Sequence, residues 1–231
     1  MTWQHCCLRK EKTMSFELVD LENWARRPYF EHYLNAVPCE YSMTVSMDIT
    51  RLRKVLQERK LKLYPVELYL LALVVNRYPQ FRTSLSADGK PGIWSDMHPS
   101  YTIFHPETET FSSIWTHWQP SFTRFYQDCL TDMEIYRHAS GFTPKPDEPA
   151  NCFPVSAIPW VSFTGFNLNL HTEGRWLLPI FTSGRFEETD GKWKLPLSVQ
   201  VHHAVCDGFH LSRFITDLQE LMDHPEQWID S

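Results

Sequence analysis

Two adjacent histidines followed by a carboxylate are the residues of this chain with the clearest capacity for chemistry. His202 and His203 begin the segment His-His-Ala-Val-Cys-Asp-Gly, in which Asp207 comes four residues after the second histidine. A neutral imidazole can take a proton from a hydroxyl group near pH 7, as the general base of an acyl transfer must. The segment therefore suggests an enzyme, although a histidine in an apolar strand is more often a core residue.

The strand that precedes the pair indicates which histidine would act. The apolar side chains alternate along residues 195–201, at Leu195, Leu197, Val199 and Val201. If this alternation continues, His203 shares their face and His202 points the other way. Burial disfavours the charged imidazolium, so we expect His203 to be largely neutral and able to accept a proton.

The spacing leaves several roles open for the neighbouring residues. Asp207 either forms a direct dyad with His203 or pairs with a distant arginine and fixes the loop. A zinc site from His202, His203, Asp207 and His210 is unfavourable, because adjacent histidines lie on opposite faces of a strand. We therefore expect no metal. Cys206 has no independent signature of a nucleophile and is interpreted as a buried thiol.

Helices are predicted on both sides of the middle of the chain. Asp48 is a candidate N-cap for a helix that ends near Arg59, and an apolar helix begins at Tyr64-Pro65 and continues to about Arg77. A third helix is predicted over residues 120–138, and a surface loop over 143–154. After Phe209 the apolar residues return at helical spacing, which predicts a final helix.

The C-terminal half contains most of the expected strands. Residues 160–163, 166–170 and 177–186 are rich in aromatic and β-branched residues, and 195–201 alternates cleanly. Thr189-Asp190-Gly191 predicts a hairpin turn between the last two runs. Strands mixed with helices indicate an α/β protein.

Composition narrows the possible partners and compartments. The 231 residues carry a net charge of −6, which argues against nucleic acid as a partner. The longest apolar run, residues 68–75, is much shorter than the roughly 20 residues of a membrane-spanning helix. Six cysteines without metal-binding spacing indicate free thiols and a cytoplasmic protein. We expect residues 1–13 to be an N-terminal extension and 14–231 to form a single domain.

Several motifs in order along the chain resemble the classical, trimeric chloramphenicol acetyltransferases. The resemblance extends from about residue 15 to about residue 222. It rests on the histidine segment at 202–210 and on four upstream segments: Asn23-Trp-Ala-Arg-Arg, Phe104-His-Pro-Glu-Thr-Glu-Thr-Phe, Ser156-Ala-Ile-Pro-Trp-Val-Ser-Phe and Phe166-Asn-Leu-Asn. It implies a two-layer sandwich in which a mixed β-sheet packs against helices, the fold of CoA-dependent acyltransferases.

The resemblance also implies a reaction and a role for each catalytic residue. The family moves the acetyl group of acetyl-CoA, a co-substrate and not a permanently bound cofactor, to the primary hydroxyl of chloramphenicol by direct transfer in a ternary complex. His203 matches the general base, Ser156 the donor to the oxyanion, and Thr182 a threonine that holds a water at the same intermediate. Asp207 and Arg26 match an ion pair that shapes the site.

The ligand pockets and the assembly follow from the same resemblance. Arg185 and Phe186 match residues that bind coenzyme A. The positions matching the drug pocket are Tyr33, Val37, Cys39, Phe111, Phe166, Leu168 and Ile180. The family implies a homotrimer with active sites at its subunit interfaces. The alternatives are the acyltransferase core of a 2-oxo-acid dehydrogenase complex, which expects a lipoyl domain upstream, and a protein that only sequesters the drug.

Overall fold

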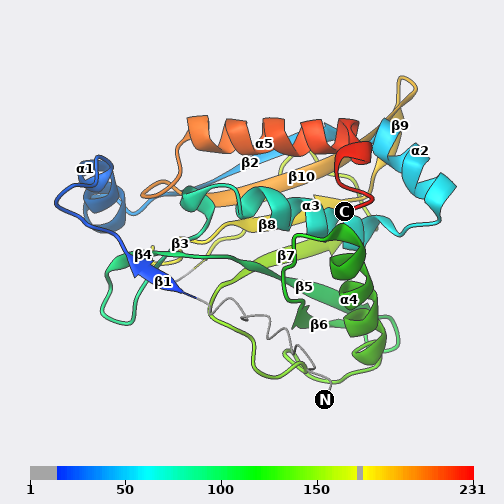
Figure 1. Cartoon of the computed structure of the whole chain (residues 1–231), viewed down its shortest axis with the longest axis horizontal. Helices are drawn as coiled ribbons and strands as arrows, with labels where there is room; N and C mark the ends of the chain where they lie inside the picture. Colours follow the sequence, from blue (N-terminus) through cyan, green and yellow to red (C-terminus); the bar gives the residue numbers. More distant parts are fainter. Residues whose placement is uncertain (1–14, 171–173) are drawn as a thin grey trace, which may run out of the picture.

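A mixed β-sheet with helices packed on one face forms most of the molecule (Figure 1). The computed structural model describes residues 15–170 and 174–231, so the expected extension at residues 1–13 lies outside the described residues. In the described part the strand order is β2-β10-β8-β7-β5-β6, and β9 pairs with β10. The contacts β5–β7 and β7–β8 are parallel, whereas the others are antiparallel.

The longest strand, β10, lies next to the histidine pair and joins three others. In the large sheet the strands are β2 (Glu40–Asp48), β5 (His98–His105), β6 (Thr110–Trp115), β7 (Cys152–Ile158), β8 (Ile180–Gly184), β9 (Glu187–Thr189) and β10 (Lys192–His202). A smaller antiparallel sheet contains β1 (Phe16–Leu18), β4 (Pro91–Trp94) and β3 (Thr83–Leu85).

Four helices supply the second layer: α2 (Thr50–Arg59), α3 (Leu63–Val75), α4 (Phe122–Ile135) and α5 (Gly208–Asp223). The short helix α1 (Arg27–Glu31) lies at one end of the molecule, and short helical turns occur at His32–Ala36, Pro79–Phe81 and Pro225–Gln227. Figure 1 shows α5 lying along β2. The Phe214 ring on α5 stacks on that of Phe181 on β8, with centroids 5.3 Å apart. Apolar packing of this kind fixes the helices against the sheet.

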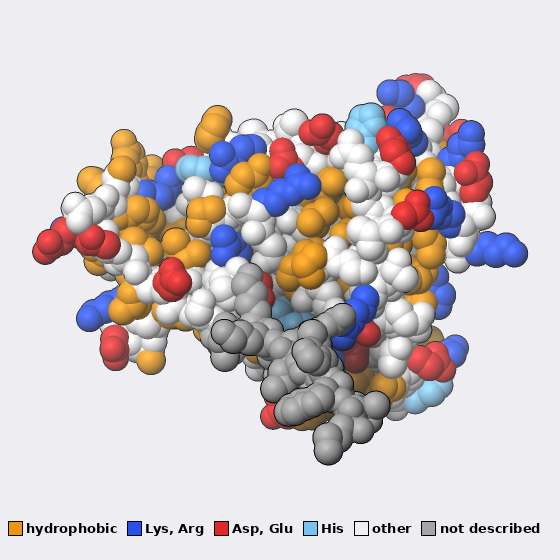
Figure 2. Space-filling model, viewed as in Figure 1, with side chains coloured by type: hydrophobic (Ala, Val, Ile, Leu, Met, Phe, Trp, Pro, Cys, Tyr) orange, Lys and Arg blue, Asp and Glu red, His pale blue; other side chains and the backbone are white. Residues whose placement is uncertain are grey.

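The surface shows no segregation of charge in the view of Figure 2, where basic and acidic side chains are interspersed. Apolar side chains gather at the end of the molecule that carries α1. Two of the large side chains exposed in this part of the chain are Tyr29 and Val37, at 58% and 53%. Among the described residues, no helix combines the length and apolarity needed to cross a bilayer.

The α/β class and the two-layer sandwich are confirmed, and so are the four predicted helices, one of which ends at Arg59 as predicted. Asp48 is not the N-cap: that position is Ile49, and Asp48 accepts hydrogen bonds from the amide and hydroxyl of Thr50. The hairpin turn is present, with positive φ at Asp190 and Gly191. The loop predicted over 143–154 ends early, because β7 begins at Cys152.

The strands predicted at 160–163 and 166–170 are wrong, since both segments are irregular. The backbone amides of Phe166 and Leu168 donate to the side chains of Thr44 and Gln200 instead of a neighbouring strand. The Phe166 carbonyl accepts from the Ser198 hydroxyl. Side-chain partners thus replace the hydrogen-bond ladder that a strand requires.

Candidate active site

His203 lies just beyond β10, where the chain turns towards α5. Its backbone amide donates to the Cys39 carbonyl over 2.8 Å, which continues the β2–β10 pairing by one residue. Its imidazole stacks on the Tyr33 ring, with centroids 4.0 Å apart and planes 10° from parallel. These contacts fix the position of the His203 backbone and the orientation of its imidazole plane.

The prediction that His203 continues the buried face of the strand is wrong. The strand ends at His202, which is the buried histidine at 1% exposure, whereas the His203 side chain is 30% exposed. The alternation of apolar residues could not distinguish a buried face of β10 from an exposed one. Residues on both faces of the strand, including Ser198 and Gln200, are buried. The Nδ1 atom of His202 accepts from the Ala204 amide over 3.1 Å, so this histidine is a structural residue of the turn.

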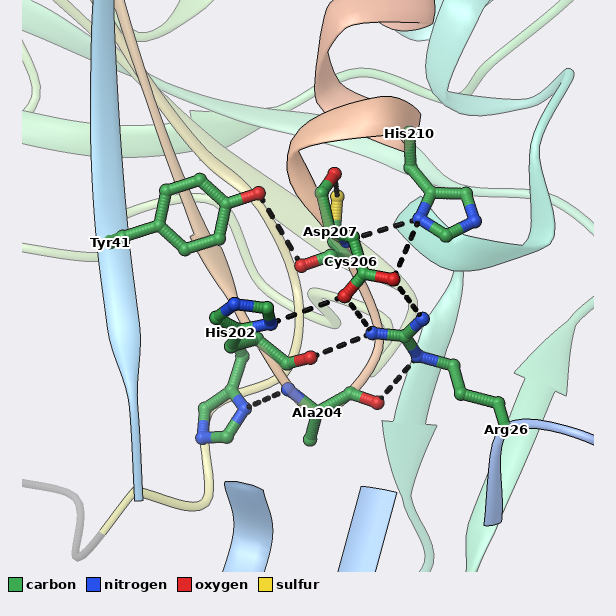
Figure 3. A network of polar contacts seen from close by, with 8 residues as sticks. Arg26, Tyr41, His202, Ala204, Cys206, Asp207 and His210 are labelled. Carbon is green, nitrogen blue, oxygen red and sulfur yellow. Dashed lines mark hydrogen bonds and ion pairs between the residues drawn. The ribbon is translucent and has the colours of Figure 1, made fainter. Parts of the chain in front are cut away.

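Arg26 holds the segment between His203 and Asp207 at three points (Figure 3). It forms two hydrogen bonds to the Asp207 carboxylate, of 2.7 and 2.5 Å. It also donates to the carbonyls of His203 and Ala204, each over 2.8 Å. The guanidinium lowers the pKa of Asp207 below its ordinary value, chiefly through these hydrogen bonds. The ion pair that the resemblance implied is therefore present.

Asp207 also approaches the imidazole of His203. One carboxylate oxygen lies 3.2 Å from Nδ1, but Nδ1 has no hydrogen bond of good geometry among the described residues. The same carboxylate forms two well-aligned hydrogen bonds with Arg26. The stronger structural partner of Asp207 is thus the arginine, and its effect on the histidine is mainly that of a nearby negative charge.

His210 and Tyr41 complete this network and were not predicted as part of it. His210 accepts from the Asp207 amide through Nδ1 over 3.0 Å, so that nitrogen carries no proton (Figure 3). The Tyr41 hydroxyl donates to the Cys206 carbonyl over 3.4 Å. Burial lowers the pKa of His210 and raises that of Tyr41. The position of His210, three residues after an N-cap carboxylate, was a usable sequence signal for its role.

A cavity of about 650 Å³ contains the second group of predicted residues. Ser156 on β7 and Thr182 on β8 are paired directly across the parallel ladder, and both line it. The other predicted residues in its wall are Phe111, Phe166, Leu168, Arg185 and Phe186. A mostly apolar cavity with a few polar groups is the usual form of a small-molecule site.

Within one chain, His203 does not line this cavity. Thr182 pairs with Ser198 on β10, and His203 lies five residues further along, which corresponds to roughly 16 Å of extended chain. The structure therefore forms the histidine network and the Ser156–Thr182 pair as two separate groups.

The remaining drug-pocket residues divide between these groups. Tyr33 and Cys39 both contact His203. Val37, between them in the sequence, has an exposed side chain. Cys39 and Leu168 line a second cavity of about 400 Å³, so Leu168 lies between the two cavities. Ile180 is buried at the start of β8. Cys206 is a buried free thiol whose pKa is raised by burial to about 12, which makes a poor nucleophile.

Comparisons with known proteins identify related sequences. A family described as chloramphenicol acetyltransferase matches residues 14–219. A chloramphenicol acetyltransferase from Clostridium perfringens is 53% identical over 216 residues, which cover 94% of this chain and 99% of the relative. One from Clostridium butyricum is 51% identical over 218 residues, covering 94% and 100%.

Solved structures show the same fold at lower identity. A chloramphenicol acetyltransferase superposes with a TM-score of 0.78 at 21% identity, covering 90% of this chain and 100% of the other. A dihydrolipoamide acetyltransferase from Azotobacter vinelandii gives 0.67 at 19% identity, covering 87% and 88%. These proteins thus share the fold of this chain although only about a fifth of their aligned residues are identical to it. Because the family match covers most of the sequence and these relatives are about half identical, the chain is an enzyme that belongs to the chloramphenicol acetyltransferase family.

Proposed function

We propose that the enzyme moves the acetyl group of acetyl-CoA to the primary (3-) hydroxyl of chloramphenicol, with both substrates bound together. His203 removes the proton as the hydroxyl oxygen attacks the thioester carbonyl. A tetrahedral intermediate forms, and its C–S bond then breaks. The imidazolium returns the proton to the departing sulfur, which gives the acetylated drug and free coenzyme A.

The contacts of His203 support its role as the base. The negative charge of Asp207, 3.2 Å from Nδ1, favours the tautomer with the proton on Nδ1. The other ring nitrogen, Nε2, is then unprotonated and can accept. Stacking on Tyr33 restricts rotation of the ring, so that Nε2 keeps one direction. Asp207 and Arg26 act here as positioning residues.

Ser156 and Thr182 supply the polar groups of the cavity wall that suit the intermediate. We assign the Ser156 hydroxyl as a donor to the oxyanion, where charge develops as the hydroxyl attacks. The adjacent Thr182 hydroxyl, from the neighbouring strand, would hold a water against the same intermediate. Both side chains lie in a largely apolar wall, where a hydrogen bond to developing charge is most effective.

His203 and Ser156 are separated within one chain, and this observation supports an active site formed by two subunits. A base and an oxyanion donor must both lie within hydrogen-bond reach of one reacting group. We therefore propose a homotrimer in which His203 of one subunit meets the Ser156 cavity of the next. A head-to-tail contact repeated three times closes a ring and uses every histidine and every cavity once.

The assembled site would have two ligand regions. Phe111, Phe166 and Leu168 form an apolar wall suited to a nitrophenyl group. Tyr33, Val37, Cys39 and Ile180 are assigned to the drug on the resemblance alone. In the wall of the same cavity, Arg185 and Phe186 offer a positive charge and an aromatic face for coenzyme A. We place the enzyme in the cytoplasm, in keeping with the free thiols of the four described cysteines.

A thiol-release assay tests the reaction. Free coenzyme A should be released only when acetyl-CoA and chloramphenicol are both present, and not with the 3-deoxy analogue, which lacks the accepting hydroxyl. Drug binding without thiol release would indicate a sequestering protein. Acetyl transfer to dihydrolipoamide but not to the drug would indicate a 2-oxo-acid dehydrogenase core. Either result would overturn the proposal.

A further inference from the structure

One buried carboxyl group in the cavity wall has no role in the reaction proposed above. Glu67 lies on α3 and is only 4% exposed, and it lines the same cavity as Ser156 and Thr182. Its Oε1 atom is buried without a hydrogen-bond partner among the described residues. A buried carboxyl oxygen without a hydrogen-bond partner destabilises the folded protein. We therefore look for its partner among the ligands that enter the cavity.

The environment of Glu67 is apolar on its own helix. Its neighbours Val66 and Leu68 are fully buried, so an apolar side chain would suit this position better for packing alone. Burial raises the pKa of Glu67 to about 7, and the side chain of Ser183 opposes this shift. The carboxyl is therefore protonated far more readily near neutral pH than an exposed glutamate.

The tyrosine and cysteine side chains in this part of the molecule stay neutral through this range. On α3 itself, burial raises the pKa of Tyr64, and burial does the same for Tyr101 on β5. Burial raises the pKa of Cys129 on α4 to about 12. Arg185, just beyond β8, is the cationic residue in the cavity wall. Glu67 is thus the group whose charge changes near pH 7 in this part of the site.

The position of Glu67 favours the acyl donor over the drug as its partner. Side chains alternate along β8, so Ser183 faces the helix layer with Phe181, while Thr182 faces the opposite side with Ser156. Glu67 therefore lies on the helix side of the sheet, whereas Ser156, Thr182 and, by the pairing of β5 with β6 and β7, Phe111 face its other side. The same cavity also contains Arg185 and Phe186, the residues assigned to coenzyme A.

We propose that Glu67 positions acetyl-CoA by hydrogen bonding to an amide of its pantetheine arm. This inference rests on the proposed function, which places the thioester carbonyl at Ser156 and hence the attached arm in the cavity. The arm carries two secondary amides, each with one N–H donor and one carbonyl acceptor. A protonated carboxyl has one O–H donor and acceptor oxygens, so it can pair with such an amide in both directions.

Ionisation of Glu67 should weaken this contact. The carboxylate keeps its acceptors but loses its donor, and the entering arm removes the water that stabilises its charge. Coenzyme A is itself an anion, which adds repulsion. Binding of the donor should therefore be tighter below pH 7 than above it.

The test compares Glu67→Gln and Glu67→Leu with the wild-type enzyme at pH 6 and pH 8.5. Glu58→Gln, the same change at an exposed position on α2, is the control. The readouts are KM for each substrate and the dissociation constant of coenzyme A by calorimetry. Glu67→Leu should raise KM for acetyl-CoA and the dissociation constant about fivefold to twentyfold at pH 6, while KM for chloramphenicol changes less than twofold.

Glu67→Gln is the conservative variant, because its amide keeps a donor and an acceptor without a charge. It should bind coenzyme A within about threefold of the wild type at pH 6. Between pH 6 and 8.5 the wild type should lose severalfold more affinity than this variant. The phosphates of coenzyme A titrate alike in both proteins, so the difference between them reports on Glu67. The short donor S-acetylpantetheine should show the same loss in Glu67→Leu, which locates the contact in the arm.

Three results would overturn this inference. They are unchanged coenzyme A binding in Glu67→Leu, a rise of KM for chloramphenicol alone, and identical pH dependence in the wild type and Glu67→Gln. Failure of the proposed function is distinguishable, because a chain that does not acetylate chloramphenicol can still be tested for coenzyme A binding by calorimetry.

Discussion

Arg26 and Asp207 lie 181 residues apart in the sequence and are joined by two hydrogen bonds between guanidinium and carboxylate. Arg26 also binds the carbonyls of His203 and Ala204, so one side chain fixes both ends of the segment that carries His203. The N-terminal region before α1 and the segment before α5 are thereby tied together at the site.

Arg26→Ala should therefore lower both stability and turnover. We expect the free energy of unfolding to fall by about 2 kcal/mol, since hydrogen bonds to charged groups are lost and the partly exposed Asp207 keeps some hydration. Turnover should fall about tenfold to a hundredfold, because the base loses its fixed position. Arg26→Lys should recover only part of the loss, as an ammonium cannot replace the forked guanidinium. Urea denaturation and steady-state kinetics measure both effects, and wild-type values in Arg26→Ala would contradict this role.

The Arg26–Asp207 pair also predicts an acid dependence of stability. The pKa of Asp207 is lowered in the folded protein, so its stabilising contribution is fully present above the unfolded-state value of about 3.9 and is lost as pH falls through the folded value. The difference in unfolding free energy between wild type and Arg26→Ala should be constant from pH 8 to 5. It should shrink below about pH 4. A difference that stays constant to pH 3 would show that the carboxylate charge contributes nothing.

The two adjacent histidines should respond differently to substitution. His203→Ala should reduce kcat at least about a thousandfold with little change in fold, because it removes the proposed base. His202→Asn retains an acceptor for the Ala204 amide and should keep kcat within about tenfold of the wild type, with a loss of stability of about 1 kcal/mol. Circular dichroism melting with the thiol-release assay separates the two effects. Equal kinetic losses in both variants would contradict the assignment of the base.

Replacing Glu67 with an apolar residue should stabilise the protein by an amount that depends on pH. Burial raises the pKa of Glu67 to about 7 in the folded protein. The free energy of unfolding therefore falls as pH rises above the pKa of the unfolded chain, and the loss is complete above pH 7. Glu67→Leu should stabilise the protein by about 1 to 3 kcal/mol at pH 8 and by much less at pH 5. Melting temperatures at the two pH values check this, and an equal shift at both would show that ionisation of Glu67 carries no such cost.

Sequence patterns were informative where one local rule decides the structure. The apolar helix α3, the Asp190-Gly191 turn and the strand-to-helix change around Asp207 each follow from neighbouring residues alone. The irregular backbone at 166–168 could not be predicted, because its amides are hydrogen-bonded to side chains of β2 and β10 that are distant in sequence. Propensity alone favours a strand there.

The motifs around His203, Ser156 and Arg26 supplied the candidate site residues, but not which histidine of the pair is buried. The burial of His202 in place of His203 could not be inferred, because the strand ends at His202 and both faces of β10 are covered. Glu67 gave no sequence signal as part of the site, since a single glutamate in a helix is normally solvent-exposed. Its burial depends on packing between α3 and the sheet.

The proposed homotrimer requires that the base and the oxyanion donor of each active site come from different subunits. The most direct test is to co-express His203→Ala and Ser156→Ala chains with different affinity tags and to assay the mixed assemblies that carry both tags. Each variant alone should be nearly inactive, since Ser156→Ala should lose about a hundredfold to a thousandfold in kcat. In every trimer that carries both tags, one site of the three should combine an intact His203 with an intact Ser156, so these assemblies should recover about a third of the wild-type activity. Mixed assemblies as inactive as the two parents would contradict a shared site.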